Sequence, residues 1–163
     1  MKSLPKISTI LYATDLGKNT RPVFKQAIAQ ARAHNASIIM MHVVEPLGET
    51  ARAVIAAYMP ETEIEGMEQE GMKNVIKHMK ERLKTFYDEE CEQHEKDLLP
   101  VKNIHVIPGS PSEEILTAAE KFKVDMIVMG QSTRKILGSK VMGSSARRVA
   151  RLSTVPVLIV PNM

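Results

Sequence analysis

The sequence predicts a single α/β domain, built as a doubly wound parallel sheet of five strands with helices on both faces. Short segments rich in β-branched and large apolar residues alternate with longer segments in which apolar residues recur at helical spacing. Residues 37–44 are nearly continuous in apolar residues, which is typical of a strand covered by helices on both faces. Regular alternation of strand and helix favours a parallel sheet with right-handed crossovers.

The composition limits the class of protein. The chain has 163 residues, 44% hydrophobic and 25% charged, as expected for one globular domain (residues 1–163). No apolar segment approaches the roughly 20 residues that cross a bilayer, and the N-terminus carries no signal-like region. A single cysteine argues against a disulfide framework. We therefore expect a cytoplasmic protein that does not bind membranes.

The charge distribution gives little support to nucleic-acid binding. The net charge is only +3, aromatic residues make up 4% and tryptophan is absent. Basic residues gather near the C-terminus, at Arg134, Lys135, Lys140, Arg147, Arg148 and Arg151. They form either a solvated helix face or a local phosphate-binding patch, and the sequence leaves both readings open.

In the first half of the chain, residues 7–13 and 37–44 are expected to be strands. The helix between them should be capped by Asn19 or Thr20 and should stop at Asn35. Residues 46–66 lack a clear period, so we expect a mobile loop or insertion there, with one short helical piece over residues 51–58.

The second half continues the alternation of strands and helices. The expected elements are a helix over about 68–97, strands at 103–107, 124–129 and 155–160, and helices at 111–122 and 143–151. Ser110 and Glu113 have the spacing of a capping box at the start of the helix that follows the strand 103–107.

Cys91 and His94 are three residues apart on the expected long helix. They continue its apolar stripe, and no further Cys or His lies at zinc-ligand spacing. We therefore expect them to pack at the core and predict no metal site.

The pattern of elements fits strand order 2-1-3-4-5 or 3-2-1-4-5. In either order, ligands bind beyond the carboxyl ends of the strands, where the order reverses. Three segments should meet there: Ala13-Thr14-Asp15, Val43-Val44, and the residues from Gly130 to Ser145.

The last of these segments contains a candidate phosphate site. Gly143-Ser144-Ser145 begins a helix, and backbone N–H groups at a helix N-terminus bind phosphate well. Arg134 and Lys135 could supply positive charge, and Asp15 could accept hydrogen bonds from a ribose or base. The alternative is an ordinary Gly-Ser-Ser helix start, because neither GxxxxGK[ST] nor GxGxxG is present.

The chain resembles the universal stress protein family over nearly its whole length. The resemblance lies in Ile10-Leu11-Tyr12-Ala13-Thr14-Asp15, Met41-His42-Val43-Val44, Gly109-Ser110-Pro111, and the stretch from Asp125 through Pro161. It implies a five-stranded parallel sheet in order 3-2-1-4-5, paired into homodimers through the last strand, Val155 to Val160.

The family's nucleotide-binding branch carries Gly-x-x-Gly, nine residues, and Gly-Ser or Gly-Thr. This chain has Gly130, then Thr133 in place of the second glycine, and Gly143-Ser144 after nine residues. By resemblance, the ligand-binding residues are Ala13, Thr14, Asp15, Val43, Met129, Gly130, Thr133, Arg134, Gly143, Ser144 and Ser145. Among them, Asp15 and Val43 match the ribose and adenine sides of the site, and Ser144 and Ser145 match the phosphate side.

The resemblance implies a homodimeric sensor or signalling module that binds ATP, or else AMP or ADP, with or without Mg²⁺. Thr133 keeps open the alternative of a dimeric scaffold that binds no nucleotide, because a β-branched residue crowds a phosphate-binding bend. Asp15 is the only carboxylate that the sequence places at the site, so we expect no more enzymatic activity than slow ATP hydrolysis.

Overall fold

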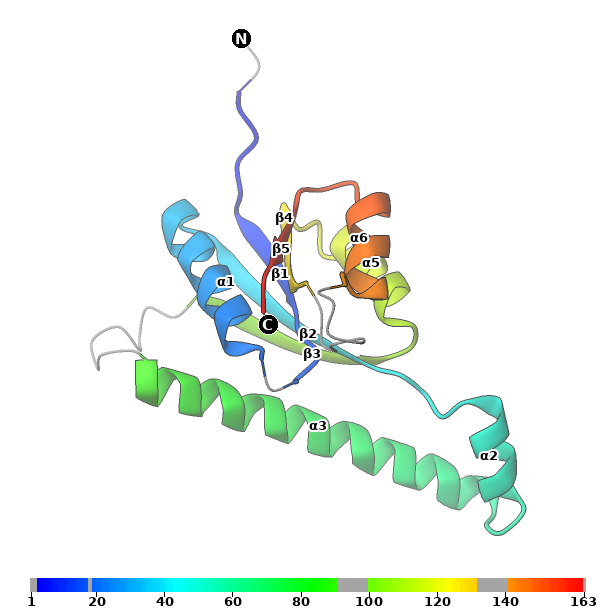
Figure 1. The fold of residues 1–163 in the computed structure, drawn as a ribbon. Helices are drawn as coiled ribbons and strands as arrows, with labels where there is room; N and C mark the ends of the chain where they lie inside the picture. The colour runs from blue at the N-terminus through cyan, green and yellow to red at the C-terminus, as the bar shows by residue number, and fades with distance from the viewer. Residues whose placement is uncertain (1–2, 18, 91–99, 132–140, 163) are drawn as a thin grey trace.

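The fold is an α/β domain with helices on both faces of one sheet (Figure 1). The structure is a computed structural model, and it describes residues 3–17, 19–90, 100–131 and 141–162. Its strands are β1 (Thr9–Ala13), β2 (Ser37–Val44), β3 (Val101–Pro108), β4 (Met126–Gly130) and β5 (Val157–Val160). Its helices are α1 (Arg21–His34), α2 (Glu49–Ala56), α3 (Glu61–Glu90), α5 (Pro111–Lys121) and α6 (Ser144–Leu152).

All strand pairs are parallel, and their order is β3-β2-β1-β4-β5. This confirms the predicted sheet and decides between the two orders that the alternation of elements allowed. Strand β1 lies in the middle, paired on one side with β2 and on the other with β4. The strand order therefore reverses between the neighbouring strands β1 and β4, and the chain leaves their carboxyl ends in opposite directions.

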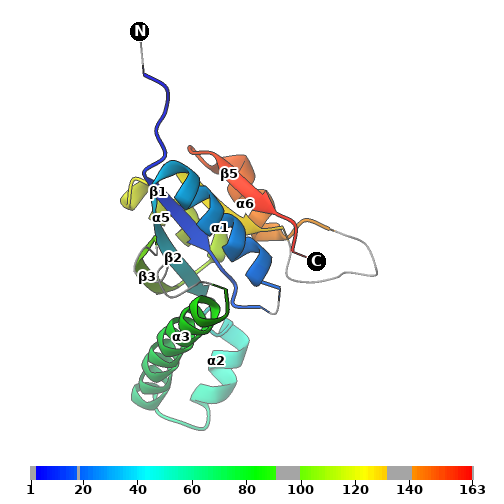
Figure 2. The same ribbon diagram turned by 90° about the vertical axis from the view of Figure 1, so that its left-hand side faces the viewer.

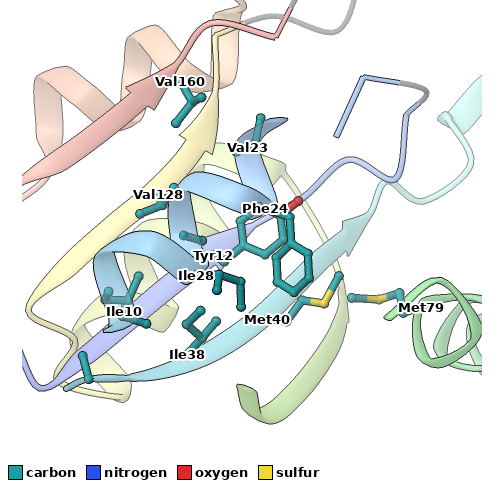
Figure 3. Close-up of a cluster of buried hydrophobic side chains, with 13 residues drawn as sticks. Ile10, Tyr12, Val23, Phe24, Ile28, Ile38, Met40, Met79, Val128 and Val160 are labelled. Atoms are coloured by element: carbon teal, nitrogen blue, oxygen red, sulfur yellow. The ribbon is translucent and has the colours of Figure 1, made fainter. Parts of the chain in front are cut away.

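Two apolar clusters sandwich the sheet. On one face, Tyr12 of β1 stacks on Phe24 of α1 with ring centroids 5.2 Å apart, and Met79 of α3 packs into the same cluster. Figure 3 shows Met79 pointing toward Met40 of β2. On the other face, α5 and α6 cover Leu11, Met41 and Ile127, among others. Alternate residues of β1 thus serve opposite cores, as a strand buried on both faces requires.

Asp125 fixes the entry of β1 against β4. Its Oδ2 accepts hydrogen bonds from the backbone N–H groups of Ser8, at 2.8 Å, and Thr9, at 2.9 Å. The Asp125 N–H in turn donates to the Thr9 carbonyl at 2.8 Å. One carboxylate therefore sets the start of two neighbouring strands, a role that the sequence reading did not identify.

The region between β2 and β3 is more helical than expected. Helix α2 begins at Glu49, and α3 begins at Glu61, seven residues before the predicted start. Together they form a hairpin that extends away from the sheet (Figure 2). Helix α2 corresponds to the short helical piece expected over residues 51–58, and none of its residues is buried. The predicted mobility of residues 46–66 stays a prediction.

Two predicted capping hydrogen bonds are absent, whereas the predicted helix stop is present. Ser110 occupies the N-cap of α5 without a side-chain cap bond. The Glu113 side chain, the other half of the expected capping box, is paired with Arg148 of α6 at 3.2 Å. Thr20 likewise makes no cap bond to α1, and its hydroxyl donates to the Gly17 carbonyl at 3.2 Å. Asn35 ends α1 in the left-handed conformation, as expected.

The predicted packing of Cys91 and His94 falls outside the described residues. Within the described ranges, no helix combines the length and the apolar character that crossing a bilayer demands.

We predict that Tyr12 makes the free energy of unfolding decrease as the pH rises in the alkaline range. Burial raises its pKa from 10.0 to about 12, against the opposing hydrogen bond from Thr14 and with support from the Asp15 carboxylate. The folded chain therefore keeps this proton to higher pH than the unfolded chain. Its stabilising contribution is complete below about pH 10 and is lost as pH rises through about 12, up to about 3 kcal/mol in total.

Denaturant unfolding from about pH 9 to about pH 12 measures this effect, with Tyr12→Phe as the comparison. Over that range the free energy of unfolding of wild type should fall by up to about 3 kcal/mol more than that of Tyr12→Phe. Tyr58→Phe is the matched control, because Tyr58 is 89% exposed. Equal pH slopes for wild type and Tyr12→Phe would contradict the prediction.

Candidate functional site

A cleft of about 880 Å³ opens at the carboxyl ends of the central strands. Its walls come from the ends of β1, β2 and β4, the start of α6 and the segment after β5. Its volume lies within the range of small-molecule sites, and its position is the switch point where ligands of open parallel sheets bind.

The loop after β1 presents Asp15 to the cleft. Thr14 is buried and anchors the loop, because its N–H donates to the Met41 carbonyl of β2 at 2.9 Å. The Asp15 Oδ1 accepts the N–H of Gly17 at 3.0 Å, which folds the loop back on itself. A Cβ at Gly17 would lie 3.0 Å from Oδ2 of Asp15, so the close approach of this carboxylate favours glycine there.

Apolar side chains line another part of the cleft. Ala13, Val43 and Met129 come from β1, β2 and β4 and belong to the cluster beneath α5 and α6. Beside them, His42 places its Nδ1 2.8 Å from the Thr14 carbonyl, which ties the ends of β2 and β1 together. The cleft therefore combines an apolar surface, suited to a flat ring, with polar groups at its rim.

The first turn of α6 supplies backbone N–H groups. Gly143 is its N-cap with φ −58° and ψ 151°, and its own N–H donates to the Gln131 carbonyl at 2.8 Å. The N–H groups of Ser144 and Ser145 follow, in the helix turn where no intrahelical acceptor exists. Arg147 places its guanidinium 3.0 Å from the Met142 carbonyl and adds positive charge at the cleft. This end can attract an anion.

Gly130 is glycine for a reason of packing. A Cβ there would lie 2.7 Å from Nδ2 of the buried Asn162 and 3.3 Å from Cγ2 of Val23. The end of β4 is therefore closed by the segment that follows β5 and by α1. Gly130 thus makes room for protein atoms.

The structure gathers most of the predicted binding residues around this cleft. Those that line it are Ala13, Thr14, Asp15, Val43, Met129, Gly130, Gly143, Ser144 and Ser145. The other two, Thr133 and Arg134, lie outside the described residues.

The sequence analysis missed several lining residues: Thr20, His42, Glu45 and Asn162. Topology could have indicated two of them. Glu45 and Asn162 follow the carboxyl ends of β2 and β5, which share one edge of a parallel sheet. Nothing in the local sequence marked Thr20 or His42. Arg147 also lines the cleft, and it had been counted only among the basic residues near the C-terminus.

Comparison with known proteins assigns the chain to a family. A sequence model described as the universal stress protein family matches residues 6–161. The chain belongs to the universal stress protein family. It is 30% identical over 152 residues to universal stress protein YxiE of Bacillus subtilis, covering 93% of this chain and 97% of that protein. It is also 28% identical over 159 residues to universal stress protein MJ0577 of Methanocaldococcus jannaschii, covering 93% of each chain.

Solved structures of the family share the fold. That of MJ0577 superposes with a TM-score of 0.68 at 27% identity, covering 96% of this chain and 97% of that chain. A universal stress protein in complex with cAMP gives a TM-score of 0.62 at 19% identity, covering 97% of this chain and 99% of that one. The Archaeoglobus fulgidus universal stress protein in complex with dAMP gives 0.52 at 16% identity, covering 96% and 99%. At these lower identities the likeness concerns the fold.

We predict that Gly130→Ala destabilises the protein by about 1–3 kcal/mol, because the new methyl group would displace Asn162 and crowd Val23. Urea unfolding measures the loss. The same substitution in an Asn162→Ala background should cost less, because the closest clashing atoms are gone. An equal cost in both backgrounds would show that the contact with Asn162 is not the cause.

Proposed function

We propose that this universal stress protein binds an adenine nucleotide, ATP or else AMP or ADP, and acts as a homodimeric sensor or signalling module in the stress response. The observation that carries the proposal is the single cleft that joins Asp15 of the β1 loop to the first turn of α6. These groups come from opposite ends of the sequence and meet at the switch point of the sheet.

The chemistry of the cleft matches the parts of a nucleotide. The apolar surface of Ala13, Val43 and Met129 suits the adenine ring. The Asp15 carboxylate suits hydroxyl donors of the ribose. The N–H groups of Ser144 and Ser145 suit phosphate oxygens, since the helix dipole favours negative charge there. Complexes of two family relatives with cAMP and dAMP support the same class of ligand.

Two alternatives give different results in the same experiments. A dimeric scaffold would bind no nucleotide, and the departure at Thr133 from the family's glycine favours that reading. ATP hydrolysis would need a positioned base and usually a metal ion. Glu45 lines the cleft together with Asp15, so a second carboxylate is present, although the sequence analysis counted one.

Calorimetry with ATP, ADP and AMP, with and without Mg²⁺, tests the proposal. Asp15→Ala should weaken binding by roughly tenfold to a hundredfold, the usual effect of losing a hydrogen bond to a charged group. Gly143→Val should weaken it by blocking phosphate, and the φ of −58° lets valine occupy that position without strain. Glu120→Ala, an exposed change on α5, should leave affinity unchanged.

Thr133→Gly distinguishes two roles for Thr133, the residue that replaces the glycine of the family's pattern. If Thr133 crowds the phosphate, glycine should tighten ATP binding, whereas if its hydroxyl donates to the phosphate, glycine should loosen it. Binding of none of the three nucleotides to wild type, and no gain from Thr133→Gly, would reject nucleotide binding and favour the scaffold.

The homodimer is proposed to form through β5. This strand lies at an edge of the sheet, and its residues Val157, Leu158 and Ile159 are only partly buried. The carbonyl of Pro156 accepts a hydrogen bond from Ile127 of β4, and the carbonyl of Val160 accepts one from Gln131, directly after β4. Since backbone groups alternate sides along a strand, Val157 and Ile159 direct theirs outward, where an antiparallel copy could pair with them across a two-fold axis.

We expect wild type to sediment as a dimer at micromolar concentration. Val157→Pro should shift it toward the monomer, because it removes an outward N–H without removing a bond to β4. Circular dichroism checks that the variant stays folded. A monomeric wild type at that concentration would overturn the β5 dimer without affecting the nucleotide proposal.

A further inference from the structure

A side chain of the long helix α3 forms hydrogen bonds with the β1 loop. Arg82 donates from Nη1 to the Leu16 carbonyl, and the same nitrogen lies 3.4 Å from the Gly17 carbonyl. These residues are separated by 66 and 65 positions in the sequence. The guanidinium therefore joins the outer helix to the loop that carries Asp15.

The loop needs such support because its backbone is strained. Leu16 has φ 59°, in the left-handed region that large side chains seldom occupy. Such a conformation persists only when its surroundings hold it. Within the loop, Leu16 N–H donates to Thr14 Oγ1 at 3.1 Å and Gly17 N–H donates to Asp15 Oδ1 at 3.0 Å. These bonds engage the N–H groups, and Arg82 engages the carbonyls of the same two residues.

Helix α3 is anchored in the core close to Arg82. Met79, one turn earlier, is fully buried in the core cluster, with Val75 and Leu83 packed against it. Figure 3 shows how Met79 enters this cluster. Between the helix and the loop lies a second cavity of about 320 Å³, lined by Leu16, Gly17 and Arg82, among others. Leu16 also packs against this cluster, and the Arg82 hydrogen bonds add a polar connection between α3 and the loop.

We propose that Arg82 is a positioning residue for the nucleotide site. It holds the loop of residues 14–17 in the strained form in which the Gly17 N–H binds the Asp15 carboxylate, and Asp15 thereby faces the cleft. This inference rests on the proposed nucleotide function. Linkage is reciprocal, so a nucleotide held by Asp15 also stabilises the attachment of α3 to the loop. The cleft and α3 are thus energetically coupled through Arg82.

Arg82→Gln removes the charge and shortens the side chain, and Lys80→Gln is the matched control. Lys80 is an exposed cation on the same helix, and its loss changes the net charge equally. Arg82→Lys keeps the charge and a single donor nitrogen but changes the shape of the side chain, so it should restore only part of the effect. Arg82 is exposed, so these variants should stay folded, which thermal unfolding verifies.

Two measurements decide the proposal. Amide hydrogen exchange of the ligand-free protein should show faster exchange at Leu16 and Gly17 in Arg82→Gln but not in Lys80→Gln. Calorimetry should show ATP binding weakened by about three- to tenfold in Arg82→Gln. In an Asp15→Ala background the same change should weaken binding less than about twofold, because Arg82 acts through Asp15.

An equal effect of Arg82→Gln with and without Asp15 would overturn the positioning role, as would unchanged ATP affinity or an equal effect of Lys80→Gln. If wild type binds no nucleotide, the proposed function fails and the role in binding fails with it. Amide exchange then still decides whether Arg82 holds the loop, so the two failures can be told apart.

Discussion

The parallel pairing of β1 between β2 and β4 is the constraint on which the rest of the structure depends. It buries Ile10, Leu11 and Tyr12 almost completely, because helices cover both faces of the central strand. It also brings the carboxyl ends of all five strands to one edge. The cleft follows from this arrangement, since the chain leaves β1 and β4 toward opposite faces and cannot fill the space between them.

Some residues around the cleft hold the fold together, and others present polar groups to the cavity. Thr14 and His42 join β1 to β2, and Gly130 admits Asn162, so these residues shape the cavity by internal contacts. Asp15, Ser144 and Ser145 instead present charge or hydrogen-bonding groups toward it. Rigid strand ends thus carry short loops whose polar groups a ligand can reach, an arrangement typical of sites in this class of fold.

Helix α3 connects two regions of different character. Around Met79 it belongs to the core, whereas its N-terminal turns form the hairpin with α2 beyond the sheet. Arg82 lies near the buried part and contacts the loop of Asp15. An element that does not line the cleft therefore contacts the loop that carries Asp15, which local sequence patterns do not reveal.

The sequence by itself determined the fold class, the identity of the five strands and the segments that meet at the cleft. Those properties follow from periodicity and from the rule that parallel strands end at one edge, so Asp15 and Gly143 could be placed together in advance. Only the tertiary structure decided that α3 begins at Glu61, that Glu113 pairs with Arg148, and that Asn162 occupies the space beside Gly130. Each of these depends on a neighbour remote in sequence, and local propensity carries no information about which partner a side chain meets once the elements pack.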